Sequence, residues 1–313
     1  MKKNFLKAIQ TLLVFSLAFT LTSCWNFDNP LEELSGSGSG GGSGSSDSDT
    51  DSTPTLTMEQ TPLTLEAAEA NAKVTFTIKV ATGPVEYSRD GKTWSPYTSA
   101  EAIELAAVGD KVMFRGTNAA YASGYSDYSN ISCDKDCYIY GNIMSLIKDE
   151  GFENENTLTA DWTFMRLFDD NTHIKNHTDA AKTLLLPATK MTAYCYFGMF
   201  SGCKGLTTTP VINVDCDGKE SCLDQMFSAC TELTKVADNS KIDGNMGSGC
   251  CCDMFQGCSK LASVPADLLP STNLASGCYQ NMFNNCTELT KAPKLPATTV
   301  EHITKCYNSM FKG

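Results

Sequence analysis

Residues 55–132 show a hydrophobic pattern with a period of two. Apolar side chains at 74, 76, 78 and 80 alternate with threonine and lysine, as a half-buried strand requires. Asp90-Gly91 follows another strand-like run, and this dipeptide favours a tight hairpin turn. These short strands predict a small, immunoglobulin-like β-sandwich. Further strands are expected at 85–88, 102–105 and 111–115.

The second half of the chain repeats one pattern, Cys-x-x-x-Met-Phe-x-x-Cys-x-x-Leu, at intervals of 27 or 28 residues. A fixed period of this size is typical of a repeat array. Each unit is expected to contain a short helix, because its Cys, Met and Cys stand at i, i+4 and i+8 and would share one face. The closing leucine is expected to open a short strand. The Met-Phe pairs lie at 199–200, 226–227, 254–255, 282–283 and 310–311.

The first unit of the array is degenerate. Residues 163–168 align with 195–200, but Asn171 and Ile174 replace the second cysteine and the leucine. Terminal repeats of solenoids are commonly atypical, because their outer face meets solvent. The predicted fold class is therefore α+β. The β-sandwich module is followed by a connecting segment, 133–159, and by a leucine-rich-repeat solenoid of strand plus short helix over 160–313.

These motifs resemble those of the BspA-like leucine-rich repeat surface proteins, also called the Treponema-type leucine-rich repeat family. The resemblance rests on Phe-x-x-Cys-x-x-Leu, on the upstream Cys-Tyr-x-x-Met-Phe, and on the Leu-Pro-Ala-Thr return at 186–189 and 295–298. It covers roughly residues 160–313, although the return is lost at 211–221 and 238–249. The family implies a lipid-anchored or secreted surface protein of host-associated bacteria, and some members are adhesins.

The N-terminus resembles a bacterial export signal. Three lysines accompany an apolar run that ends at Leu21, which is too short to span a bilayer comfortably. Leu-Thr-Ser-Cys24 resembles a lipobox, so we expect removal of residues 1–23 and acylation of Cys24. The acyl chains would anchor the chain outside the cytoplasm, in the outer membrane at the cell surface. Residues 24–54 are a Gly/Ser/Asp-rich linker that buries too little apolar area to fold. An ordinary signal peptide with a chance cysteine is the alternative.

The chain is acidic, with 36 Asp and Glu against 24 Lys and Arg and a formal net charge of −12. This balance argues against nucleic acid or anionic lipid as a partner, so membrane contact is expected through the acylated Cys24 alone. His173 and His177 have the spacing of a zinc-peptidase helix, but Ile174 stands where its glutamate belongs. We expect no enzymatic activity and no cofactor.

Cysteine is abundant, with 15 residues in the chain. Disulfides are common in extracytoplasmic proteins, but helices stacked about 8–10 Å apart would hold equivalent cysteines too far apart for them. We therefore expect the repeat cysteines to be buried free thiols. Cys216 and Cys250 to Cys252 are extra to the pattern or adjoin it, yet no Cys-x-x-Cys pair supports a metal site there, and no metal is expected. Cys133 and Cys137 either close a small disulfide loop or lie between modules.

The outward residues of the predicted strands would form a long face. Candidate binding residues on it are Thr207, Lys235, Ser263 and Lys291. The expected function is non-catalytic binding of a protein or glycan ligand, and the resemblance implies adhesion to host matrix proteins or other cells. The alternative is a structural, self-assembling surface protein. The sequence ends inside a motif at 310–313, and an uncapped repeat would invite self-association.

Overall fold

The computed structural model describes residues 56–300 and 303–313. The expected signal, Cys24 and the linker over 24–54 lie outside the described residues. The described residues belong to one compact unit. Within the described part of the chain, no helix has the length and apolarity needed to cross a membrane.

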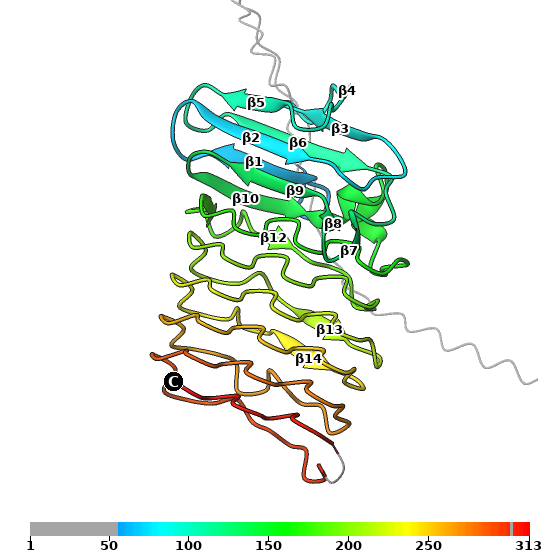
Figure 1. Ribbon diagram of the computed structural model, residues 1–313. Helices are drawn as coiled ribbons and strands as arrows, with labels where there is room; N and C mark the ends of the chain where they lie inside the picture. The colour runs from blue at the N-terminus through cyan, green and yellow to red at the C-terminus, as the bar shows by residue number, and fades with distance from the viewer. Residues whose placement is uncertain (1–55, 301–302) are drawn as a thin grey trace, which may run out of the picture. The chain divides into compact units, whose positions relative to one another are not determined.

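The N-terminal part of this unit contains two β-sheets (Figure 1). The larger sheet has the order β11-β10-β1-β6-β3-β4, and β12 also pairs with β10; the smaller sheet has the order β5-β2-β9. The strands are β1 (Leu63–Ala67), β2 (Ala72–Thr77), β3 (Val85–Ser88), β4 (Ser95–Pro96), β5 (Ala102–Leu105), β6 (Lys111–Gly116), β9 (Asn130–Cys133) and β10 (Cys137–Asn142), with a small hairpin of β7 (Ala122–Gly124) and β8 (Asp127–Tyr128).

Aromatic side chains fill the space between the two sheets. Phe76 on β2 meets Phe114 on β6 edge to face, with ring centroids 5.6 Å apart, and Tyr121 packs on Phe76 at 5.5 Å. The Tyr121 hydroxyl donates to the Leu146 carbonyl oxygen at 2.8 Å. This bond fixes the short 3₁₀ turn η1 (Ile143–Leu146) against the core. A second 3₁₀ turn, η2, spans Phe152–Asn154.

The repeats continue directly from these sheets. Strand β10 pairs antiparallel with β1 and parallel with both β11 (Ile174–Asn176) and β12 (Leu184–Leu185). The first coil also bonds to the smaller sheet, because the Ile131 N–H donates to the Leu167 carbonyl at 2.7 Å. The following coils carry β13 (Asn213–Asp215) and β14 (Lys241–Asp243), which pair in parallel.

The predicted strand-plus-helix solenoid is wrong. The only helical elements among residues 56–300 and 303–313 are the two 3₁₀ turns, so the described chain is almost entirely β and irregular structure. The segment expected to be the helix of the first regular unit is a run of consecutive turns. Tyr194, Gly198 and Gly202 have φ of 57°, 57° and 71°, whereas an α-helix needs φ near −63° at every residue.

A four-residue turn accounts for the spacing that suggested a helix. Phe197 N–H donates to the Tyr194 carbonyl within the coil, whereas Tyr196 N–H donates to Cys222 O and Gly198 N–H to Asp224 O in the next coil, at 3.0 and 2.8 Å. Positive φ recurs every fourth residue, and the buried residues recur with it. The apolar stripe at i, i+4 and i+8 is therefore a property of the turns. The same φ pattern occurs at Ser221, Gln225 and Ala229, at Gly249, Asp253 and Gly257, and at Gly277, Asn281 and Asn285.

The phenylalanine of each Met-Phe pair, together with Phe168 of the degenerate first unit, lies in a continuous stack through the coils. Neighbouring rings are 5.3 to 5.6 Å apart and within 8° of parallel. This spacing is close to the ~4.8 Å separation of hydrogen-bonded backbones, so equivalent cysteines lie much closer than on packed helices. All 14 described cysteines are free thiols, and all but Cys252 are buried. The stack comprises Phe168, Phe200, Phe227, Phe255, Phe283 and Phe311.

Candidate functional site

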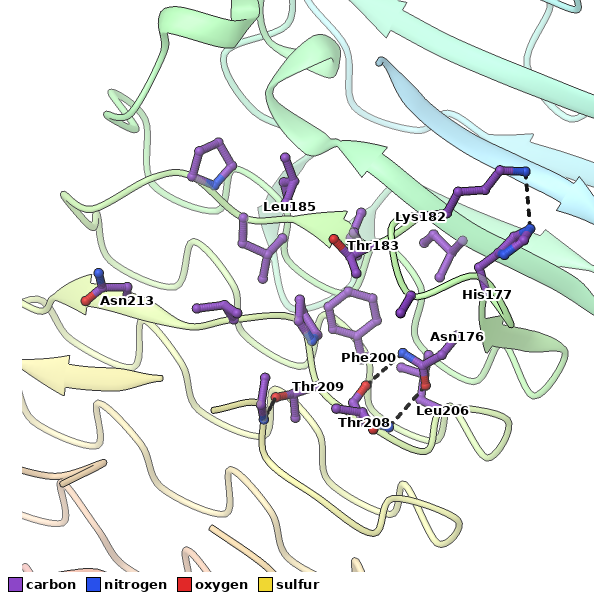
Figure 2. A pocket seen from close by; sticks show the side chains of 18 of the residues that line it. Asn176, His177, Lys182, Thr183, Leu185, Phe200, Leu206, Thr208, Thr209 and Asn213 are labelled. Carbon is purple, nitrogen blue, oxygen red and sulfur yellow. Dashed lines mark hydrogen bonds between the residues drawn. The ribbon is translucent and has the colours of Figure 1, made fainter. Parts of the chain in front are cut away.

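A pocket of about 590 Å³ lies beside β12 and the loops on either side of it (Figure 2). Its wall is apolar and includes the buried side chains of Leu184, Leu186, Phe200 and Leu206. Val211 also lines it and is 48% exposed, so an apolar surface continues from the pocket to solvent. The size lies within the roughly 300–1,000 Å³ of typical ligand pockets.

The side chain of Asn176 closes one side of the pocket. Asn176 ends β11, and its Oδ1 accepts from the backbone N–H groups of Thr207 and Thr208 at 2.8 and 3.1 Å. Its Nδ2 donates to the Thr208 carbonyl at 2.9 Å. One amide side chain therefore makes the bonds that a neighbouring strand would otherwise make to the start of the next coil.

A charged cluster lies at the edge of the pocket where His177 and Lys182 line it. Glu66 on β1 accepts from the Tyr140 hydroxyl at 2.7 Å, from Lys182 Nζ at 2.9 Å and from His177 Nε2 at 3.3 Å. Burial opposes ionisation of Glu66, but the hydrogen bonds from Lys182, Tyr140 and His177 outweigh it and hold the pKa of this carboxyl below its usual value. Burial, together with Glu66, raises the pKa of Tyr140.

Both ring nitrogens of His177 are engaged. The backbone N–H of Asp179 donates to Nδ1 at 2.8 Å, so the proton of the neutral ring is assigned to Nε2, which faces Glu66. The other histidine of the pair, His173, contacts Asp136 instead, with 3.1 Å between Nδ1 and Oδ1. The two histidines therefore bind different carboxylates, and they flank a strand rather than a helix turn.

The structure brings together only some of the predicted binding residues. Lys235 forms a parallel bridge with Ser263 in the next coil. In the preceding coil, Lys235 pairs with Thr208 and not with the predicted Thr207. Thr207 lies one position earlier and bonds to Asn176. Lys291 is exposed further along the chain. Thr208 lines the pocket, whereas none of the four predicted residues does.

Sequence reasoning missed the pocket because its wall belongs to the return segment. The run Leu184-Leu185-Leu186-Pro187 is the signal that could have indicated the pocket. A two-residue strand with one buried face does not need three consecutive leucines, so the additional apolar side chains indicate an apolar wall. The described residues hold two groups of three side chains suited to a metal, and neither group lines this pocket.

No family model, no curated protein and no solved structure matches the chain. The chemistry of the pocket and its surroundings is thus the basis for a functional proposal.

Proposed function

We propose that this chain is a non-catalytic binding protein that holds its ligand at the pocket beside β12. The observation that carries the proposal is the preformed apolar wall, which runs from the buried Phe200 out to the exposed Val211. Ligand sites commonly combine such a wall with a few polar groups that fix orientation. Here the exposed Thr183 and Asn213 lie at the rim and supply polar side chains.

The ligand that suits this site best is a protein segment with one bulky apolar side chain. The wall buries an apolar anchor, and the rim offers amide and hydroxyl groups to the flanking backbone. The histidine of the site supports a binding role over a catalytic one, because its ring nitrogens are bonded to Asp179 and Glu66. A general base needs a nitrogen within reach of the substrate proton.

Adhesion to matrix proteins or to other cells is the biological role we propose, on the strength of the repeat motif's resemblance to surface adhesins. Display at the cell surface would follow from acylation of Cys24. Labelling of growing cells with a palmitate analogue tests this: the chain should take up label, and Cys24→Ser should abolish uptake. Label retained in Cys24→Ser would contradict the anchor without bearing on the pocket.

Binding is tested with the purified chain on immobilised matrix proteins and on whole bacterial cells. Val211→Asp should weaken binding at least tenfold, because it places a carboxylate on the apolar wall. The matched control is Val108→Asp, since Val108 is 65% exposed and does not line the pocket. Equal binding by the two variants would show that another surface holds the ligand. Binding no stronger than that of an unrelated lipoprotein, across all surfaces, would contradict adhesion.

A further inference from the structure

Four thiols meet inside the coil stack, away from the pocket. The Sγ atom of Cys250 lies 3.3 Å from that of Cys222, 3.1 Å from that of Cys216 and 3.7 Å from that of Cys251. All four residues are fully buried. Cys216 directly follows β13, Cys222 stands in the turns of the same coil, and the other two stand in the turns of the next coil. The cluster therefore joins two successive coils.

Two of these cysteines depart from the repeat. In the neighbouring coils, a large apolar residue stands four positions before the first repeat cysteine. In this coil, whose first repeat cysteine is Cys222, that position is Gly218, and Cys216 stands two residues before it. The residue after the first repeat cysteine is aromatic or leucine in the neighbouring coils, but it is Cys251 here. Both departures place a thiol at the same point. The usual residues at the first position are Met191, Met246 and Leu274, and those at the second are Tyr196, Leu223 and Tyr279.

The second cysteine of each repeat unit behaves differently. The second cysteine of each unit donates its S–H to a backbone carbonyl of the preceding coil, at 3.0 or 3.1 Å. These thiols have their own acceptors and pack as small buried groups. In the cluster, the Sγ contacts of Cys216, Cys250 and Cys251 are to other sulfurs. The separate thiols are Cys203, Cys230, Cys258 and Cys286.

The spacing of the clustered sulfurs is close to that of a thiolate metal site. Zn–S bonds of about 2.3 Å in a tetrahedron put neighbouring sulfurs ~3.8 Å apart. The separations from Cys250 Sγ, 3.1 to 3.7 Å, are shorter than this, so these sulfurs must move apart to admit an ion. The Sγ atoms of Cys216, Cys222 and Cys250 all lie within 4.8 Å of one another. Cys251 is outside that group of three, so its sulfur must move toward the others to become a fourth ligand. Thiolates are soft ligands that select Zn²⁺ or Cu(I) over harder cations.

We propose that Cys216, Cys222 and Cys250 bind one thiophilic metal ion, Zn²⁺ or Cu(I), with Cys251 placed to supply a fourth sulfur to Zn²⁺. Each thiol that becomes a ligand loses its proton, so binding releases one proton per coordinated sulfur and involves no change of oxidation state. The site is closed to solvent and links two coils, so the bound ion would stabilise the stack. It is a structural site and is independent of the proposed ligand pocket.

The test is metal binding by the purified, anaerobically reduced chain. Elemental analysis after loading with Zn²⁺ or Cu(I) should find one ion per chain, and Co²⁺ used as a probe should give sulfur-to-cobalt charge-transfer absorption. A tetrahedral cobalt spectrum indicates four ligands, which at a site closed to solvent are four sulfurs, and favours Zn²⁺. Tight binding of Cu(I) with no such spectrum indicates the three-sulfur site. Failure to bind any of the three ions would overturn the proposal.

Two variants and one control locate the ion. Cys216→Ala should lower the affinity at least tenfold, whereas Cys258→Ala, which removes an equally buried thiol with its own carbonyl acceptor, should leave it within twofold. Cys251→Leu places at this position the residue type of Leu223, its equivalent in the preceding coil, and is therefore expected to fold. Because this variant lacks the fourth sulfur but keeps the other three, it should lose the tetrahedral cobalt spectrum. Unchanged affinity in Cys216→Ala would contradict a metal site. So would a mass two hydrogens lighter with two fewer titratable thiols in the chain as purified, before reduction, because that result would indicate a disulfide.

Discussion

Asn176 and Thr208 exchange two hydrogen bonds, although neither the residues nor their coils pair as strands at this point. Asn176 Nδ2 donates to the Thr208 carbonyl at 2.9 Å, and Thr208 N–H donates to Asn176 Oδ1 at 3.1 Å. The same Oδ1 also accepts from the N–H and the hydroxyl of Thr207. A single side chain thus substitutes for a strand and leaves space beside it, which is where the pocket lies.

Asn176→Leu should destabilise the chain and weaken ligand binding at the pocket. Leucine is of similar size but bonds to nothing, so two backbone N–H groups and one carbonyl lose their partner at a cost of about 1–3 kcal/mol. Urea unfolding of the purified variant measures this loss. Asn245→Leu is the control: Asn245 is exposed, and its side-chain Oδ1 accepts from the Asn273 side chain at 2.9 Å, so a change below ~0.5 kcal/mol is expected. Equal losses in the two variants would contradict the role given to Asn176.

Ala229 and Gly257 occupy the same place in successive turns, and both have positive φ, 57° and 74°. A Cβ on Gly257 would lie 3.7 Å from its nearest neighbour, the Ala229 Cα, so space is sufficient and only the backbone is strained. Gly257→Ala should therefore lower the free energy of unfolding by about 1 kcal/mol.

Ala229→Gly should act in the opposite direction. It relieves the strain of a left-handed alanine, offset in part by the greater freedom of glycine in the unfolded chain, so we expect a gain of up to ~1 kcal/mol. Urea unfolding of the pair measures both. Destabilisation by both variants would show that packing, and not φ, governs this position.

The period of the array could be predicted from the sequence, but the local conformation of each unit could not. Cys195, Met199 and Cys203 stand four residues apart, and both a helix near 3.6 residues per turn and a chain of four-residue turns bury such residues on one side. The two conformations differ in the backbone angles of the intervening residues, and here Gly198 and Gly202 have the positive φ of the turns. In the next coil the same positions are Gln225 and Ala229, which carry no such signal in their residue type.

The candidate sites were less accessible to sequence reasoning than the strands. The alternation over 74–80 overlaps β2 at 74–77, because a strand's pattern is local, but β2 (Ala72–Thr77) ends before the alternation does. The pocket depends on Asn176 bonding to Thr208 across 32 residues, which no local pattern contains. The expectation that equivalent cysteines lie far apart was wrong, because it assumed packed helices, and the coils contain turns stacked at a much shorter spacing. Cys216 and Cys251 do break the repeat, and that departure is the signal that could have located the thiol cluster.

Asp224 and Asp253 form a pair of carboxyl groups whose buried Oδ1 atoms have no hydrogen-bond partner. Burial and, next, the charge of Asp253 raise the pKa of Asp224 from 3.8 to about 7. Between these two values, Asp224 stays protonated in the folded chain, whereas in the unfolded chain it has already lost its proton. Stability contributed by this proton is present below pH ~4 and is lost as the pH rises through 7.

Asp224→Asn should therefore stabilise the chain at pH 8 and have little effect near pH 4. The full pKa difference would correspond to ~4 kcal/mol, but residual solvent screens the charge, so we expect about 1–2 kcal/mol. Urea unfolding at both pH values tests this. Asp238→Asn is the control, since its side chain is 76% exposed and pairs with Lys235. A gain of the same size at both pH values would exclude titration of Asp224 as the cause.

The phenylalanine stack allows burial to be separated from stacking. Phe227 lies between Phe200 and Phe255, at 5.3 and 5.6 Å, and is fully buried. Phe311 stacks on Phe283 at 5.5 Å but is 46% exposed. Phe227→Ala should cost ~3–5 kcal/mol because the rigid neighbours leave a cavity, whereas Phe311→Ala should cost about 1 kcal/mol or less, since it leaves no enclosed void. Thermal unfolding followed by circular dichroism ranks the two variants. Similar losses at both positions would mean that ring stacking itself, present in both, provides most of the stabilisation.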